Sequence, residues 1–548
     1  MKITQPTGPF MQIIPSGIAL VLTLAGALDS WGQAAPRLAN PRYNIAGRVA
    51  NSSTGEPIAR AAIAALSDQD NHTVASVLSD AEGHFLIEHL PAGKYPLSAS
   101  KRGFRTALYD EHEDFNTAIV TGEGLDTEHL EFQLAPSAVL HGIITGDGGD
   151  PIDGASVILF RRPDPSHPGE QVKQVDGTTS DDTGAYEFSN LPAGEYLVAV
   201  KADPWYALHG RANRNPDNSS ANLDVAYPIT LFDSTVDEGA AAPITLAEGS
   251  HEDANISLHA VPALHLRLPR VVRRGAPPVE LHETVFGNQI QSHGADLMAV
   301  QQGAIEVTGI APGHYELTHG DPPRTMELNA ASDLDIDANA GRPVVSVSGT
   351  LRSSSGTAIT EDANVVLEAA DAAGRTPLST IAHKGQFQFD AVQPGRWNIS
   401  LYVGATGQAL PVTSIGNGSR ALAGNQIVVA DQPLNIVVAV SRIQTRIQGF
   451  ARANGKPAAG VMVVLVPREP AAHQALVRRD QSDSDGSFSL RDVPPGQYIV
   501  IAIEDGWKLD WRRRDGLARY LSGGVPVTVG NRLEPVVQLA QPVPAVPR

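Results

Sequence analysis

The chain of 548 residues contains no cysteine. Structural disulfides, thiolate metal sites and cysteine nucleophiles are therefore excluded. Aromatic residues are also scarce, at 5% of the sequence, whereas glycine and proline number 51 and 40. A sequence with many turn-forming residues and few long helical patterns favours an all-β chain.

Positive charge is in short supply as well. The sequence has 41 Lys and Arg against 60 Asp and Glu, which gives a formal net charge of −19. A surface of this sign repels polyanions, so the composition argues against binding to nucleic acid or to an anionic membrane. Beyond the N-terminal region no stretch is long and apolar enough to cross a bilayer as a helix. We therefore predict no membrane span in the mature chain.

One short pattern recurs along the chain at domain-sized intervals. In its clearest copy Gly83 is followed by alternating apolar residues, then by Leu90, Gly93 and Tyr95. The copies begin at Gly83, Gly184, Gly303, Gly385 and Gly486, and they end at the aromatic residues Tyr95, Tyr196, Tyr315, Trp397 and Tyr498. Alternation of apolar residues indicates strands with one buried face. Self-similarity at this interval predicts an array of about five like modules.

The remaining positions of the repeat predict turns. Asp80, Asp181 and Asp483 each lie three residues before the first glycine. Asp at the start and Gly at the end of a four-residue turn is a common preference, so we expect these aspartates to serve backbone geometry. The second glycine, such as Gly496, is expected to supply the positive φ of a tight turn.

The repeat divides the chain into six predicted segments. They are a signal peptide (1–34), a first β-sandwich (43–136), a second with a polar loop insertion (137–260), a degenerate third (261–340), a fourth (341–441) and a fifth (442–543). The insertion at 203–222 is rich in Asn, Asp and Ser, which predicts a loop. We expect one helix over 511–521, capped by Asp510. The proline-rich tail at 540–548 is expected to be disordered.

The full motif resembles a known domain family. An opening strand with glycine precedes G-x-P-x-x-G-A/V and then D-x-x-G-x-F-x-F-x-x-L-P-x-G-x-Y, most clearly in the first, second and fifth copies. This order is similar to the carboxypeptidase regulatory-like domain. The resemblance implies a transthyretin-like (Ig-like) β-sandwich of seven strands in each module. It also implies no activity, because in the carboxypeptidases this domain accompanies a separate zinc peptidase domain and does no chemistry itself.

The sequence lacks common motifs of catalysis, since H-E-x-x-H, G-x-S-x-G and a phosphate loop are all absent. His167 and Glu170 have a spacing that suits zinc, but they lie in a proline-rich loop, and spacing alone is weak evidence. Asp483 and Asp485 imitate part of a calcium loop, yet strands flank them where an EF-hand has helices. We prefer a turn there. The sequence thus predicts no catalytic residue, no cofactor and no metal.

Two groups of aromatic residues fall outside the repeated positions. Trp507, Trp511 and Tyr520 gather near the end of the fifth module, and Trp205 and Tyr206 occupy the equivalent place in the second. Aromatic faces beside carboxylates and guanidiniums suit a sugar ring, so these five are the candidate ligand-binding residues. The alternative is that the rings pack over a sandwich, and for the fifth-module group we favour packing.

These observations favour an exported, non-catalytic repeat protein that binds or spaces in the periplasm, at the cell surface or outside the cell. Glycans are the preferred ligand class by analogy of fold, with other envelope proteins as alternative partners. A second hypothesis is a surface adhesin of the collagen-binding B type, whose sandwiches are locked by isopeptide bonds. The opening strands at Tyr43, Val139, Val345 and Thr445 contain no lysine, which counts against it. The periplasmic extension of a receptor and an enzyme rank lower.

The N-terminal region predicts export. Lys2 precedes an apolar run at 13–28, and small residues follow at Ala34 and Ala35. This order is typical of a secretory signal peptide, although an uncleaved membrane anchor is the alternative. We predict cleavage near Ala34 or Ala35, so mass spectrometry of the exported protein should find a new N-terminus there. Recovery of an intact Met1 would show that the segment is retained.

Overall fold

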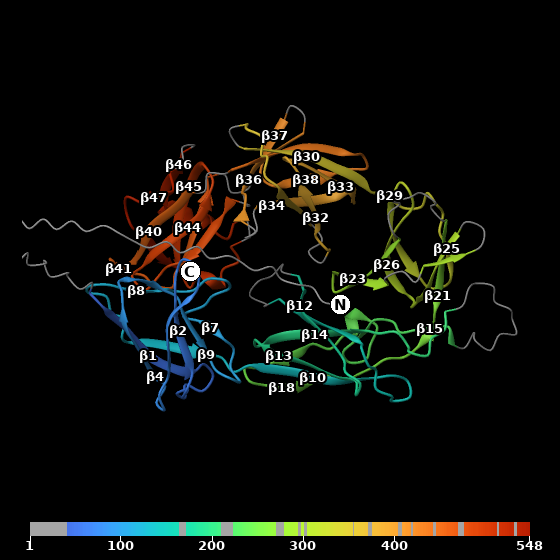
Figure 1. Cartoon of the computed structure of the whole chain (residues 1–548), viewed down its shortest axis with the longest axis horizontal. Helices are drawn as coiled ribbons and strands as arrows, with labels where there is room; N and C mark the ends of the chain where they lie inside the picture. Colours follow the sequence, from blue (N-terminus) through green and yellow to red (C-terminus); the bar gives the residue numbers. More distant parts are fainter. Residues whose placement is uncertain are drawn as a thin grey trace, which may run out of the picture. The chain divides into compact units, whose positions relative to one another are not determined.

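The computed structural model describes residues 41–163, 171–209, 223–269, 279–293, 297–300, 304–353, 356–370, 375–403, 408–417, 420–441, 445–468, 476–511, 515–530 and 534–548 (Figure 1). The predicted signal peptide, Gly303 and the pair His167 and Glu170 lie outside these ranges. Among the described residues the regular secondary structure is almost entirely β, and five hydrophobic cores each draw on the strands of one module. The predicted tandem array of β-sandwiches is confirmed.

The first module has nine strands. They are β1 (Tyr43–Asn51), β2 (Ala62–Leu66), β3 (Thr73–Leu78), β4 (His84–Leu90), β5 (Gly93–Tyr95), β6 (Leu97–Ser100), β7 (Ala107–Leu108), β8 (Ile119–Thr121) and β9 (Leu130–Leu134). Their sheets have the orders β4-β1-β9 and β3-β2-β6-β7, with β5 and β8 as a separate pair. The alternation read from the sequence is realised in β4, where Phe85, Ile87 and Leu90 are buried.

The second module repeats this plan. It contains β10 (Ala138–Thr145), β11 (Ser156–Arg161), β12 (Lys173–Thr179), β13 (Ala185–Leu191), β14 (Gly194–Lys201), β15 (Val225–Ala226), β16 (Thr230–Leu231), η2 (Glu238–Ala240), β17 (Ile244–Leu246), β18 (His251–Asp253), β19 (Ile256–Ser257) and β20 (Val261–Pro262). Strand β10 pairs antiparallel with β13 and parallel with β18 and β19. Strand β20 pairs with β15, so pairing continues past the predicted boundary at residue 260.

The third module forms two sheets despite its eroded sequence. Its strands are β21 (Leu264–Pro269), β22 (Glu280–Val285), β23 (Asn288–His293), β24 (Leu297–Val300), β25 (Ala304–Ile310), β26 (Gly313–His319), β27 (Arg324–Ala330), β28 (Leu334–Asp335) and β29 (Arg342–Pro343). They pair in the orders β24-β25-β21-β28 and β23-β22-β26-β27-β29. Every second residue of β26 is buried from Tyr315 onward, and Tyr315 and Leu317 thereby join the core of the module.

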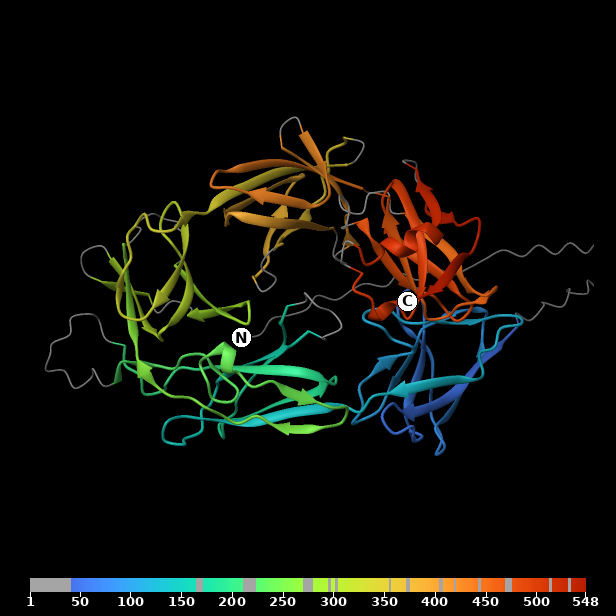
Figure 2. The ribbon, with the colours of Figure 1, turned by 180° about the vertical axis from the view of Figure 1, so that it is seen from behind.

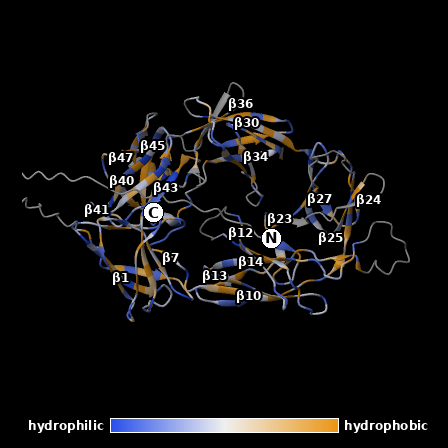
Figure 3. Cartoon of the chain, viewed as in Figure 1, coloured by the Kyte–Doolittle hydropathy of each residue, from blue (hydrophilic) through white to orange (hydrophobic). Residues whose placement is uncertain are grey.

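The fourth module has two sheets of five strands each. Its strands are β30 (Val345–Ser353), β31 (Ala363–Ala369), β32 (Leu378–Ala382), β33 (Gln386–Val392), β34 (Gly395–Val403), β35 (Gln408–Ala409), β36 (Val412–Asn417), β37 (Arg420–Ala423), β38 (Gln426–Val429) and β39 (Leu434–Val440). Phe387, Phe389 and Trp397 fill the space between the sheets. Figure 2 shows these strands from behind, and in Figure 3 hydrophobic residues gather on the strands of the modules.

The strands of the fifth module form one continuous sheet of nine strands. It contains β40 (Thr445–Ala453), β41 (Lys456–Pro457), β42 (Met462–Pro467), β43 (Arg478–Gln481), β44 (Ser487–Val493), β45 (Gly496–Glu504), η4 (Gly506–Lys508), η5 (Ala518–Gly523), β46 (Val525–Val529), β47 (Val536–Gln538) and β48 (Val543–Pro547). The last strand, β48, pairs parallel with both β40 and β45, and Val543 is fully buried.

Two predictions for this module are wrong. The tail is not disordered, because β48 fills the gap between two open strand edges and satisfies their backbone groups. The single helix over 511–521 is replaced in the described residues by the short 3₁₀ helices η4 and η5. Their aromatic residues pack on the sheet, which favours short turns over one continuous helix.

A hydrogen bond recurs at the closing aromatic residue of every module. The side chains of Tyr95, Tyr196, Tyr315, Trp397 and Tyr498 donate to the carbonyl oxygens of Pro91, Pro192, Ala311, Gln393 and Pro494 at 3.1, 2.7, 2.7, 3.0 and 2.8 Å. In the first, third and fifth modules the ring thereby folds back over the second glycine of the repeat, namely Gly93, Gly313 and Gly496. A Cβ atom on Gly496 would lie 3.0 Å from the Tyr498 hydroxyl oxygen.

This contact corrects the reason given for the second glycine. Gly496 lacks the positive φ that we expected, whereas Gly486 has a φ of 80°. Glycine is required at 496 because the ring of Tyr498 occupies the space of a side chain. At Gly486 two effects act together, because φ is positive and a Cβ atom would lie only 2.6 Å from the carbonyl oxygen of Ala451.

We predict that Gly496→Val is much more damaging than Gln497→Ala. The valine must displace the buried Tyr498 ring, at a cost of about 1–3 kcal/mol in the free energy of unfolding. Gln497 is exposed, so its truncation should cost less than about 0.5 kcal/mol. Thermal melts of the two variants give the comparison, and equal melting temperatures would show that the ring contact is unimportant.

Candidate functional site

The five candidate aromatic residues lie in two contrasting environments. Trp507 and Tyr520 are buried, and Trp511 is partly buried beside them. They pack with Met462 and other residues on the face of β42 and β45 that points away from the module's core. Trp205, by contrast, is 89% exposed. The interpretation we favoured for the fifth-module group, packing over a sandwich, describes its place in the structure.

Two rings from the first module cover the fifth-module aromatics. Phe115 lies 5.3 Å from Trp507 between ring centroids. His112 stacks on the same indole at 5.5 Å with an interplanar angle of 12°. The aromatic insertion of the fifth module is therefore one half of an interface with the first module. We call this contact the first–fifth interface; it joins residues 94 and 110–120 to residues 479–487 and to Trp507 and Trp511.

Arg479 connects the aromatic and charged parts of the first–fifth interface. Its guanidinium lies 4.3 Å from the ring centroid of Trp511 and 5.3 Å from that of Phe115. The same group donates two hydrogen bonds, of 3.0 and 2.6 Å, to the carboxylate of Glu113. A bidentate pair of this kind is stronger and more directional than a single ionic contact. Because the Arg479 side chain is only 11% exposed, it is also shielded from solvent.

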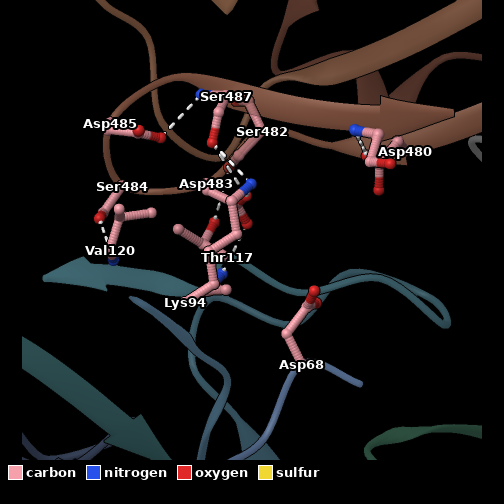
Figure 4. Close-up of polar contacts among 12 residues, drawn as sticks. Asp68, Lys94, Thr117, Val120, Asp480, Ser482, Asp483, Ser484, Asp485 and Ser487 are labelled. Carbon is pink, nitrogen blue, oxygen red and sulfur yellow. Dashed lines mark hydrogen bonds and ion pairs between the residues drawn. The ribbon is translucent and has the colours of Figure 1, made fainter. Parts of the chain in front are cut away.

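The polar centre of the first–fifth interface is Asp483 (Figure 4). Its Oδ1 accepts a hydrogen bond of 3.2 Å from the backbone N–H of Ala118, and its Oδ2 pairs with the Lys94 ammonium. Lys94 also donates to the hydroxyl of Ser487 at 2.8 Å. The next residue, Ser484, donates its backbone N–H to the carbonyl oxygen of Ala118 at 3.0 Å.

Asp483 departs from the role expected of the repeat aspartates. Asp80 and Asp181 cap their own turns, each accepting two backbone N–H groups at 2.7 to 3.0 Å. For these two the expectation is confirmed. In the fifth module Asp485 accepts the N–H of Ser487 at 2.9 Å, and the Asp483 carboxylate faces the first module. The position in the repeat cannot reveal this change, because all three aspartates share it.

Carboxyl groups near the first–fifth interface have shifted pKa values. Burial raises the pKa of Asp480 to about 7, and the N–H of Ser489 that Asp480 accepts offsets part of that effect. Burial also raises the pKa of Asp483, and the positive charge of Lys94 acts in the opposite direction. Removing Lys94 would leave the Asp483 carboxylate buried without a counter-charge, which is costly.

A second buried polar group lies between β21 and β25. The two ring nitrogens of His265 lie 2.8 Å from Asp224 Oδ2 and 3.0 Å from Glu306 Oε1. His209 reaches Asp224 Oδ1 at 3.1 Å. Sequence reasoning missed this network, since its residues come from distant segments without a common motif. Among the residues that the structure describes, no group of three or more His, Asp or Glu side chains is placed to hold a metal ion.

The pKa of Asp480 leads to a prediction for the pH dependence of stability. A carboxyl whose pKa is higher in the folded chain lowers the free energy of unfolding as pH rises from about 4 to 7, and the loss is complete above pH 7. Asp480→Asn keeps an oxygen acceptor for Ser489 and cannot ionise. We expect this variant to melt at a higher temperature than the parent at pH 8 and at a similar one at pH 4.5. An equal difference at both pH values would contradict the assignment.

The strands, cores and contacts together define a tandem β-sandwich repeat protein. Matches to two family models support this class and name the kind of domain in three of the modules. The carboxypeptidase regulatory-like domain matches residues 44–134 and 139–228. The model described as BOS complex subunit NOMO1-like, second beta sandwich domain matches residues 444–515. These matches support a repeat protein with carboxypeptidase regulatory-like domains, as its motifs predicted.

Several solved structures of bacterial proteins match the chain at low sequence identity. The Bacillus anthracis TIE protein is 11% identical, with a TM-score of 0.17 and coverage of 74% of this chain and 76% of that one. The minor pilin GBS52 of Streptococcus agalactiae is 14% identical, with a TM-score of 0.19 and coverage of 42% and 100%. The major pilin subunit BcpA of Bacillus cereus is 10% identical, with a TM-score of 0.14 and coverage of 73% and 100%. At these values the likeness concerns the fold alone.

No curated protein matches the chain. In the described part of the chain no helix combines the length and the apolar character that a membrane span needs.

Proposed function

We propose that this protein is an exported, non-catalytic array of β-sandwiches that binds and spaces at the cell envelope, with carbohydrate as its ligand. The observation that carries the binding role is the exposed indole of Trp205, in the second module. A large aromatic side chain that is 89% exposed forgoes most of the stabilisation that burial gives. A sugar ring stacked on it recovers that stabilisation.

The surroundings of Trp205 support a carbohydrate contact. Tyr206 packs edge-on against the indole, with ring centroids 5.8 Å apart and an interplanar angle of 88°. Even with this contact, Trp205 remains 89% exposed and most of its surface is accessible to a ligand. The carboxyl group of Asp203, an exposed residue two positions earlier, is an acceptor for sugar hydroxyls. An apolar face with polar groups at its edge is the usual composition of a small-ligand site.

The fifth-module aromatics support this role less well. Phe115 and His112 already cover Trp507, and Arg479 covers Trp511. A glycan at that place has to displace the first module. Of the two candidate groups, we therefore assign the glycan contact to Trp205 and Tyr206.

We predict that Trp205→Ala abolishes most glycan binding without changing the melting temperature. The mature chain is first applied to a glycan array, and the affinity of the parent and the variant for the bound glycan is then measured by calorimetry. Loss of one stacking contact should weaken binding roughly tenfold or more. Leu208→Ala, at an exposed aliphatic residue of the same segment, is the matched control and should bind like the parent. Unchanged binding by Trp205→Ala, or no glycan bound by the parent, would refute the assignment.

An array for protein partners is the second candidate function. The observation that favours it is the first–fifth interface, in which loops of one module bind another module through hydrogen bonds and ring contacts. Purified envelope and matrix proteins tested beside the glycans separate the two candidates. Binding to a protein that Trp205→Ala leaves intact would favour this second function.

A further inference from the structure

The first module presents an open strand edge to the fifth module. Strand β8 pairs only with β5 among the described strands, so one of its edges has no strand neighbour. The backbone groups on that edge are bonded by the fifth module instead. Ala118 bonds through its N–H to Asp483 and through its carbonyl oxygen to Ser484, and the N–H of Val120 donates to the Ser484 hydroxyl at 2.8 Å. The turn of the fifth module thus takes the place of a missing strand.

This edge is buried by the contact. Ala118 is 4% exposed, and Thr117 beside it is 1% exposed. Gln481 reaches across and donates to the hydroxyl of Thr117 at 2.8 Å and to the carbonyl oxygen of Asp110 at 2.5 Å. Buried backbone groups without partners are costly, so the first module depends on a polar partner at this place.

Only the turn of the fifth module has the side chains that this edge requires. In its sequence Asp483-Ser-Asp-Gly-Ser487, the first aspartate and both serines contact the first module. The corresponding turns, Asp80-Ala-Glu-Gly-His84 and Asp181-Asp-Thr-Gly-Ala185, have neither serine. The matching change on the other side is Lys94, because the same repeat position holds Glu195, His314, Arg396 and Gln497 in the other modules. Lys94 and the turn of the fifth module are therefore complementary in charge and in hydrogen-bonding groups.

We propose that the first–fifth interface is an intrachain clasp, in which the partner of the β8 edge is the turn at residues 482–487 of the same polypeptide. Asp483 is its specificity-determining residue: its carboxylate accepts a hydrogen bond of 3.1 Å from the hydroxyl of Ser487 in its own turn and pairs across the contact with Lys94. Arg479, bound to Glu113, and the rings around Trp507 extend the contact. The clasp holds the first and fifth modules of the array together, so the reach of the array as a spacer depends on whether the clasp is closed. This inference does not depend on the nature of the ligand.

The absence of cysteine makes the clasp directly testable in the full chain. Asp68 and Arg491 lie at the margin of the contact, 3.6 Å apart, and both are substantially exposed. The double variant Asp68→Cys with Arg491→Cys, treated at low protein concentration with a short bismaleimide, should form a cross-link within one chain. Peptide mass spectrometry identifies it. The matched control pairs Asp68→Cys with Ser189→Cys, the same repeat position in the second module, and should give no such product.

Charge variants then test the role of Asp483. Added to the cysteine pair, Asp483→Lys should lower the rate of cross-linking about tenfold, because it places two positive charges together. Exchange of the charges, with Lys94→Asp and Asp483→Lys combined, should restore much of the rate. Asp181→Lys, at the same position of the second module's turn, should leave it unchanged. Circular dichroism confirms that each variant is folded.

Three outcomes would overturn the proposal. The first is equal cross-linking with and without Asp483→Lys, which would show that Asp483 selects no partner. The second is cross-linking between two chains instead of within one, which would assign the turn's partner to a second copy. The third is equal yield from the control pair, which would show that the two modules meet without specificity.

Discussion

Each module depends on the way its closing aromatic side chain is held. The side chain donates to a carbonyl oxygen four residues earlier in all five modules. This contact fixes the turn between two strands, and it carries a large side chain into the core of the module. In the first, third and fifth modules its ring also lies over the glycine two residues earlier. In those three modules the ring leaves too little room for a side chain larger than glycine. Tryptophan replaces tyrosine at position 397 because an indole N–H can make the same hydrogen bond.

A second constraint is that backbone groups at strand edges need partners. The fifth module meets it with β48, which pairs with β40 and β45 and turns a proline-containing tail into a central strand. The first module meets it at β8 with a turn from the fifth module. In both cases a segment far away in the sequence completes an edge. The same physical need therefore shapes the inside of one module and the contact between two.

The aromatic residues outside the repeat separate into two roles. In the fifth module Trp507, Trp511 and Tyr520 cover the outer face of a sheet, and this cluster also contacts the first module. Their apolar surface is therefore buried by other parts of the same chain. In the second module Trp205 has no such cover. If glycans bind at Trp205, ligand binding and the clasp occupy different modules, and either one can change without the other.

The repeat motif by itself determined the class of fold, the number of modules and most of the strands. Alternating apolar residues and fixed glycine spacing are local features, and each module's core follows from them, as β4 and β26 show. The tail, the short helices and the role of Asp483 were decided only by tertiary structure. Val543 and its proline neighbours form a strand because two distant edges meet there. The Asp483 carboxylate pairs with Lys94, which lies 389 positions away in the chain and stands beside it only in the folded structure. A local pattern records which groups can form hydrogen bonds, but the partners that distant segments bring to them are fixed only when the chain folds.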